Sequence, residues 1–138
     1  MNFEDFIKKG LVKKKDIDKN LAKSLIVAAE SDLKFLKRNK IDDVSARKMV
    51  SGYYDVLREL LEAMAALSGY KIYSHEAFFY FLEEKGEDVM GEKFNRFRLI
   101  RNRVNYYGKT VSPNEAEEYC LGIGKMIKYF MRKLNDEI

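Results

Sequence analysis

Residues 43–67 read DVSARKMVSGYYDVLRELLEAMAAL, and this stretch decides the fold class of the 138-residue chain. Its apolar residues recur at alternating steps of three and four, which is the spacing of one face of an α-helix. That face consists of Val50, Tyr53, Leu57, Leu60, Met64 and Leu67. Asp42 or Asp43 can cap the start of the helix, and Gly69 can end it. We therefore predict one long amphipathic helix in the middle of the chain.

The same spacing continues on both sides of this segment. Long helices are predicted at 19–38, at 89–105 and from Pro113 onward, where the run Ser112-Pro113-Asn114-Glu115 has the form of a capping box. A short aromatic helix is predicted at 74–84, with Ser74 as its cap and Gly86 after it, and a single helical turn at 3–9. The apolar stripe of the last helix consists of Ala116, Cys120, Ile123, Ile127, Phe130 and Leu134.

Together these elements predict an all-α fold, an antiparallel bundle of four long helices plus a short one, in a single domain over residues 1–138. Gly122 and Gly124 lie inside the last helix. Because each glycine lowers helix stability by about 1 kcal/mol relative to Ala, we expect the backbone of another helix to approach closely there. The residues expected to form a mobile basic segment are Lys13, Lys14 and Lys15.

Composition excludes several classes of protein. Cys120 and His75 are the only cysteine and histidine, so a disulfide framework and a zinc site lack ligands, and no metal or other cofactor is expected. No stretch has the roughly 18 consecutive apolar residues of a membrane span, and residues 1–10, MNFEDFIKKG, lack the apolar core of a secretory signal. We therefore expect a cytoplasmic protein that makes no membrane contact. Charge is segregated, with Lys and Arg in excess over residues 1–40 and 91–138, and Asp and Glu in excess over 41–90.

Arg101 interrupts the apolar face of the predicted helix at 89–105. A guanidinium on that face must be paired or must face a water-filled groove, since an isolated buried charge is too costly to keep. One interpretation is an ion pair with Glu59 or Asp55. The other is a phosphate site, because Arg98, Asn102 and Asn105 lie on an adjoining face, at steps of four and three, and form one polar cluster with Arg101. The other residues of the apolar face are Met90, Phe94, Phe97 and Val104.

Two runs of sequence resemble a known family. They are GYKIYSHE at 69–76, after the long amphipathic helix, and LIRNRVNYYG at 99–108. Together they resemble the HEPN domain of prokaryotes, particularly archaeal members, over about residues 40–135. The resemblance implies a small helical bundle that forms a homodimer and works with a minimal nucleotidyltransferase as a toxin and antitoxin pair. Active members are metal-independent endoribonucleases, whose signature is an arginine, a polar residue and, a few positions on, a histidine with a tyrosine near it.

Arg101 matches the arginine of that signature and Asn102 the polar residue after it, while the histidine position falls on Asn105 or Tyr106. Neither replacement is a suitable base at neutral pH, since asparagine does not titrate and tyrosine has a pKa near 10. The resemblance therefore implies a protein that binds RNA or a nucleotide in a groove at the dimer interface. The residues expected to hold phosphate are Arg98, Arg101, Asn102 and Arg103.

Two alternatives remain open at this point. One is an endoribonuclease toxin with Arg101, Asn105 and Tyr106 as its catalytic residues; the other is a non-enzymatic helical interaction module. The resemblance also marks Tyr107 as a candidate for modification by the partner transferase. For His75 we expect a structural role in the first turn of the short helix, where the helix dipole lowers the pKa of an imidazole.

Overall fold

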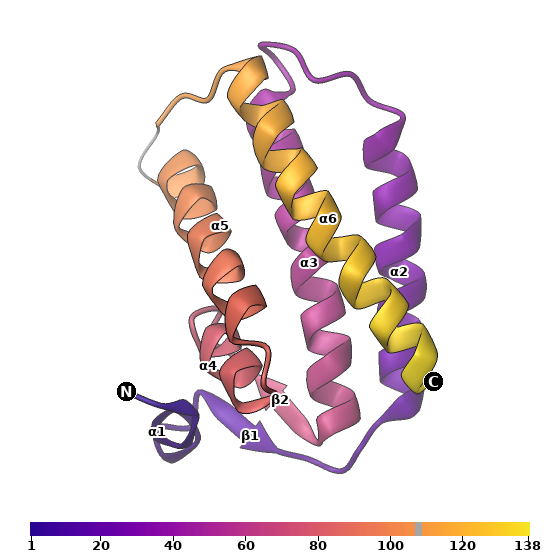
Figure 1. Cartoon of the computed structure of the whole chain (residues 1–138), viewed down its shortest axis with the longest axis vertical. Helices are drawn as coiled ribbons and strands as arrows, with labels where there is room; N and C mark the ends of the chain where they lie inside the picture. The colour runs from indigo at the N-terminus through magenta and orange to yellow at the C-terminus, as the bar shows by residue number, and fades with distance from the viewer. Residues whose placement is uncertain (107–108) are drawn as a thin grey trace.

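The computed structural model describes residues 1–106 and 109–138, which form an antiparallel bundle of helices (Figure 1). The long helices are α2 (Lys19–Lys37), α3 (Ala46–Ser68), α5 (Asp88–Tyr106) and α6 (Pro113–Glu137). The shorter elements are α1 (Phe3–Lys8), β1 (Val12–Lys14), β2 (Tyr70–Ile72) and α4 (Ala77–Glu84). The predicted all-α bundle is confirmed. None of the helices in the described residues combines the length and the apolar character needed to cross a membrane.

Helix α3 is the centre of the bundle. It packs against α2, α5, α6 and β2, and α6 crosses over it in Figure 1. Because its neighbours cover it on several sides, more of its surface is buried than the single predicted face. Tyr53, which the spacing placed on that face, is only partly buried, whereas its neighbour Tyr54 is 0% exposed. Because α3 is central, the side of this helix that carries Tyr54 packs against α5.

The ends of the helices follow most of the predicted signals. Ser112 and Glu115 form the capping box at the start of α6, and Gly69 ends α3 with φ at 82°. The prediction of Asp42 or Asp43 as the cap of α3 is wrong, because the N-cap residue is Ser45 and it makes no side-chain capping bond. The carboxylate of Asp42 instead accepts the backbone N–H groups of Val44 and Ser45 in the turn before the helix. The prediction of Ser74 as a side-chain cap is wrong. Helix α4 begins only at Ala77, with no side-chain cap, and Ser74 accepts through its carbonyl oxygen.

The glycines of α6 lie where α5 and α3 come close. A Cβ atom at Gly122 would be 2.8 Å from Cζ of Phe97, on α5, which is closer than carbon atoms pack. At Gly124 the nearest atom, Cε1 of Tyr53 on α3, would be 3.7 Å away, an ordinary contact. The expected approach of another helix's backbone is therefore wrong, because the atoms closest to both glycines belong to aromatic side chains. All six residues of the predicted α6 stripe are buried, including Cys120.

The N-terminal basic segment is ordered, which corrects the prediction of a mobile one. Lys13 and Lys14 belong to β1, which pairs antiparallel with β2, and the backbone N–H of Lys15 donates to the carbonyl of Gly69 at 2.9 Å. The pair was missed because three residues on each strand are too few to show an alternating pattern. Val12 and Ile72 face each other across the pair and are both buried, so this short ribbon closes one end of the core.

Candidate functional site

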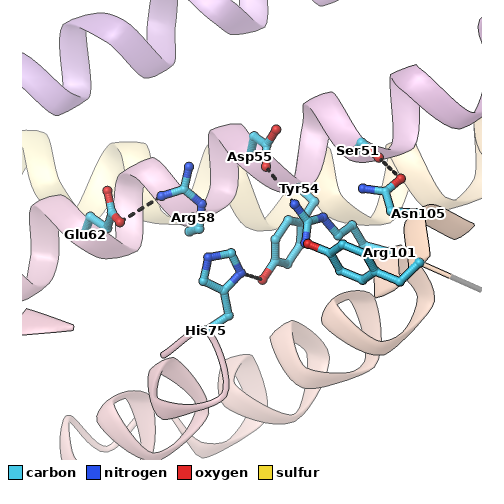
Figure 2. Close-up of polar contacts among 9 residues, drawn as sticks. Ser51, Tyr54, Asp55, Arg58, Glu62, His75, Arg101 and Asn105 are labelled. Atoms are coloured by element: carbon cyan, nitrogen blue, oxygen red, sulfur yellow. Dashed lines mark hydrogen bonds and ion pairs between the residues drawn. The ribbon is translucent and has the colours of Figure 1, made fainter. Parts of the chain in front are cut away.

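One side of α3 is polar where α5 packs against it (Figure 2). Arg101 and Asn105 reach this side from α5, and His75 reaches it from the segment between β2 and α4. We call the arrangement the α3–α5 site. Its residues on α3 are Ser51, Tyr54, Asp55, Arg58 and Glu62.

Arg101 is the central cation of the site, and its side chain is only 15% exposed. Its Nη1 donates a hydrogen bond to the hydroxyl of Tyr106 at 3.0 Å, and its Nη2 lies 3.9 Å from Oδ1 of Asp55. Its Nε is buried and has no hydrogen-bond partner within residues 1–106 and 109–138. Since a guanidinium carries five N–H donors, most of the donor capacity of Arg101 is not used by the protein atoms described.

Two tyrosine rings hold the guanidinium in place. Its Cζ lies 5.2 Å from the centre of the Tyr54 ring and 5.4 Å from that of the Tyr106 ring. Both distances are within the range of cation–π attraction. Tyr54 is fully buried and Tyr106 is 67% exposed, so the cation has one wall in the core and one at the surface. The charge of Arg101 is therefore oriented but not sealed from solvent.

The ion pair with Asp55 is weak. Of the two carboxylates considered from the sequence, Asp55 is the partner, but the separation of 3.9 Å is long for a charged hydrogen bond. Burial raises the pKa of Asp55, and the opposing effects of Arg58 and Arg101 are smaller. A carboxylate in a tight pair with an arginine has a lowered pKa instead. Asp55 therefore leaves the charge of Arg101 only partly neutralised.

Two further arginines lie near the site, and only one of them is paired with a carboxylate. Arg58 is paired with Glu62, with Nη1 2.8 Å from Oε1. Arg98 donates from Nε and Nη2 to the side-chain oxygen of Asn95, at 3.1 and 2.8 Å. Because asparagine carries no charge, this contact orients Arg98 and leaves its positive charge in place. Arg98 and Arg101 thus supply positive charge that the nearby carboxylates do not balance.

His75 is a neutral imidazole at neutral pH. Its pKa is lowered to about 4, first by burial and then by the charges of Arg58, Arg101 and Arg98. Its Nδ1 lies 3.1 Å from the hydroxyl of Tyr54. Burial raises the pKa of Tyr54, so this hydroxyl stays protonated and shares a hydrogen bond with Nδ1. His75 precedes the first residue of α4 by two positions, so burial and the arginines, and not the expected helix dipole, explain its pKa.

The other predicted site residues lie in different surroundings. Asn105 faces α3, where its Oδ1 accepts a hydrogen bond from Oγ of Ser51 at 2.7 Å, so it helps to join the two helices. Asn102 and Arg103 line a separate hollow of about 560 Å³ on α5, together with Arg96. The predicted phosphate-binding set is thus divided between two surfaces, Arg98 and Arg101 on one and Asn102 and Arg103 on the other. Tyr107 lies outside the described residues.

A larger groove lies elsewhere in the bundle. It has a volume of about 840 Å³ between α2 and α6, and Tyr53 and Cys120 are among its lining residues. Burial raises the pKa of the Cys120 thiol to about 12, so this cysteine is an unreactive core residue. None of the predicted site residues lines this groove. The described residues contain no cluster of three or more His, Cys, Asp or Glu placed to hold a metal ion.

The sequence did not single out Tyr54 and Arg58. One signal for them was available, since polar residues at 51, 55, 58 and 62 recur at helical spacing beside the apolar face of α3. No family model matches the chain, and neither a curated protein nor a solved structure is significantly similar to it. Function must therefore be inferred from the geometry of the α3–α5 site.

Proposed function

We propose that this chain is a HEPN-type protein that binds RNA or a nucleotide, with Arg101 holding a phosphate group at the α3–α5 site. One observation carries the proposal. The guanidinium of Arg101 is held between two tyrosine rings with a buried Nε that has no partner among the described residues, while its carboxylate neighbour stays at 3.9 Å. A purely structural arginine in this position would be expected to use Nε and to bind its carboxylate closely.

Phosphate fits this arrangement chemically. A guanidinium can donate two parallel hydrogen bonds to phosphate oxygens, which an ammonium group cannot do. The positive charge of Arg98 adds to the attraction, because its own partner Asn95 is neutral. The exposed ring of Tyr106 lies against Arg101 and offers a surface on which a base can stack.

Binding is favoured over cleavage in this proposal. Metal-free cleavage of RNA needs a base that removes the proton of the 2′-hydroxyl group, and an imidazole suits this task when its pKa is near neutral. The pKa of His75 is lowered to about 4 and its Nδ1 is engaged by Tyr54, so it is a weak base. The amide oxygen of Asn105 is engaged by Ser51. The alternative is an endoribonuclease of the same family, so the experiment must distinguish RNA cleavage from RNA binding.

The resemblance supports two further parts of the proposal, a homodimer and a minimal nucleotidyltransferase as partner in a cytoplasmic toxin and antitoxin module. A dimer with the α3–α5 site at its interface would place two copies of Arg101 near one ligand and raise the local positive potential. Sedimentation of the purified protein tests the dimer. Co-purification with the product of an adjacent nucleotidyltransferase gene tests the partner.

The central experiment compares Arg101→Ala and Arg101→Lys with the wild-type chain. Binding of a fluorescein-labelled, single-stranded 12-nucleotide RNA of mixed sequence is measured by fluorescence anisotropy at low salt. We expect Arg101→Ala to weaken binding by about 10-fold or more, because hydrogen bonds to charged groups contribute about 1.5–3 kcal/mol. Arg101→Lys should recover only part of the affinity, since lysine keeps the charge and loses the paired donors.

The matched control is Arg132→Ala, which removes one exposed arginine from α6. If Arg101→Ala binds RNA no more weakly than Arg132→Ala, the proposal is wrong. Gel analysis of the same RNA after incubation tests the alternative. Cleavage by the wild-type protein that Arg101→Ala abolishes would identify an endoribonuclease in place of a binding protein.

A further inference from the structure

The outward face of the β1–β2 ribbon carries a pair of like charges. Lys13 and Lys71 are directly opposite each other in the antiparallel register, and both are exposed. Like charges placed directly opposite destabilise a strand pair. The neighbouring pair, Val12 and Ile72, faces the core, so this face of the ribbon is the outer one. Two positive charges therefore lie side by side on the outer face of the ribbon.

An exposed aromatic ring lies beside the two lysines. The Nζ atoms of Lys13 and Lys71 are 5.7 and 5.9 Å from the centre of the Tyr73 ring, which is 52% exposed. The backbone N–H of Tyr73 donates to the carbonyl of Leu11 at 2.8 Å, which continues the ladder beyond β2. The two cation–ring distances place Tyr73 beside both lysines at the surface of the ribbon. We call these residues, Lys13, Lys71 and Tyr73, the ribbon face.

The protein supplies no carboxylate partner to the two cations in the part of the chain that the structure describes. The ion pairs there are Arg58–Glu62, Arg101–Asp55 and Lys133–Glu87. Two ammonium groups beside a half-exposed aromatic ring are complementary to the phosphates and the bases of a single strand of nucleic acid. Its phosphates bind cations, and its bases stack on aromatic rings whatever their sequence.

A short series of contacts links the ribbon face to the α3–α5 site. Tyr73 is two residues from His75, whose ring centre is 5.9 Å from that of Tyr54, and Tyr54 lies 5.2 Å from the guanidinium of Arg101. With about 3.5 Å per residue of chain, these steps add up to an upper limit on the order of 20 Å for the separation of Tyr73 from the guanidinium of Arg101. Even at the spacing of about 3.4 Å per nucleotide of a strand stacked in a duplex, roughly six nucleotides cover a separation of this size, and an extended strand needs fewer.

We propose that the ribbon face is a second contact for single-stranded RNA, on which Tyr73 stacks against a base while Lys13 and Lys71 hold the flanking phosphates. The inference rests on the proposed function, because it assigns to the ribbon face the same strand that Arg101 holds. It specifies the ligand of the proposed function as a single strand that spans both surfaces. The preferred ligand is a single strand of several nucleotides, of which roughly six are long enough to reach both surfaces, and a mononucleotide engages Arg101 alone.

A different role for the lysines is protection of the strand edges, since charged residues on exposed edge strands prevent pairing with other chains. The two roles differ in what removal of the charges does. If the lysines only protect the edges, their removal leaves RNA binding unchanged and promotes self-association. If they hold phosphate, their removal weakens RNA binding and leaves the fold at least as stable, because the repulsion between them is removed.

The test uses the double variant Lys13→Thr/Lys71→Thr, since threonine favours strands and carries no charge. Its matched control is Lys125→Thr/Lys128→Thr, which removes two lysines from α6. Anisotropy is measured with labelled RNAs of two and twelve nucleotides over a range of salt concentrations. For the 12-mer we expect the slope of log K against log salt to fall by about 1.4 in the double variant, about 0.7 for each phosphate that a lysine no longer neutralises. The slope of the control should fall by much less.

Tyr73→Ala and Tyr73→Phe separate stacking from charge. Tyr73→Ala should weaken binding of the 12-mer about 5-fold to 100-fold, the range for removal of one stacked base, and Tyr73→Phe should bind like the wild type. Binding of the 2-mer should be unaffected by the ribbon variants and weakened by Arg101→Ala.

The outcomes distinguish the two proposals. If the ribbon variants bind the 12-mer like the wild type while Arg101→Ala does not, the ribbon face is not an RNA contact and the proposed function stands. If Arg101→Ala binds normally while the ribbon variants lose affinity, the proposed function fails and the ribbon face alone binds RNA. Urea unfolding of every variant verifies that a loss of affinity is not a loss of folded protein.

Discussion

The hydroxyl of Tyr54 lies 3.1 Å from Nδ1 of His75, and this hydrogen bond joins the buried centre of α3 to the segment between β2 and α4. The same tyrosine ring lies 5.2 Å from the guanidinium of Arg101. One side chain therefore positions both the histidine and the arginine. Because Tyr54 is fully buried and cannot change its orientation without disturbing the core, it gives the α3–α5 site a rigid wall.

Tyr54→Phe should destabilise the protein by about 1 kcal/mol, because it removes the hydrogen bond to His75 and leaves Nδ1 without its partner. The free energy of unfolding is measured by urea denaturation at pH 7. Tyr53→Phe is the control, since Tyr53 lines the open groove between α2 and α6 and is only partly buried. Equal effects of the two substitutions would contradict the assigned hydrogen bond.

The stability of the protein should fall as the pH drops from 6.5 to 4 through the contribution of His75. Its pKa is lowered from 6.5 to about 4 in the folded chain, so the unfolded chain binds more protons between these values. The stabilising contribution is complete above pH 6.5 and is lost progressively toward pH 4. Urea unfolding of wild type and His75→Gln between pH 7 and 4.5 measures it. The difference between the two curves should change as the pH falls, and parallel curves would show that the pKa of His75 is not lowered.

The contribution of Glu59 to stability should change with pH in the direction opposite to that of His75. Burial, together with the hydrogen bond and the negative charge of Asp32, raises the pKa of Glu59 from 4.5 to about 7. The folded chain therefore binds more protons than the unfolded chain between pH 4.5 and 7, and stability is lost as the pH rises through this range. Glu59→Gln should unfold at the same urea concentration as wild type near pH 4.5 and at a higher one at pH 8. Glu118→Gln, at an exposed position of α6, should show no such divergence. A Glu59→Gln variant that is less stable than wild type at pH 8 would refute the assignment.

The two glycines of α6 should respond oppositely to substitution by alanine. At Gly122 the new Cβ would be 2.8 Å from the Phe97 ring, so overpacking should destabilise the protein by about 1–3 kcal/mol. At Gly124 the nearest atom would be 3.7 Å away, so the better helix propensity of alanine should stabilise the protein by up to about 1 kcal/mol. Thermal and urea unfolding measure both. If Phe97→Leu relieves the effect of Gly122→Ala, the clash is the cause; if it does not, the explanation is wrong.

Helix positions followed from the sequence because they depend on local periodicity and on chemical signals at the ends. The capping box at Ser112, the left-handed Gly69 and the buried stripe of α6 are features of one element or its flanks. The β1–β2 ribbon could not be predicted in the same way. Its strands are three residues each and lie on either side of α2 and α3 in the chain, so only the packed bundle brings them together.

The candidate site was predicted in part. The break in the apolar face of α5 correctly placed Arg101 at a partly buried position, and Asp55 was one of the two carboxylates considered for it. Spacing within one helix suggested a single cluster that included Asn102, whereas the structure places Asn102 with Arg103 in a separate hollow. Helical spacing gives the direction of a side chain but does not give the neighbour that it meets.

The sequence by itself determined that this chain forms a bundle of helices and that one arginine interrupts an apolar face of that bundle. Only the tertiary structure decided that the arginine lies between Tyr54 and Tyr106, that His75 is neutral near it, and that Lys13 faces Lys71 across a strand pair. The physical reason is that helix formation and amphipathicity depend on residues three or four positions apart, whereas pKa values, cation–π contacts and strand pairing depend on groups from distant segments that meet only when the core is packed.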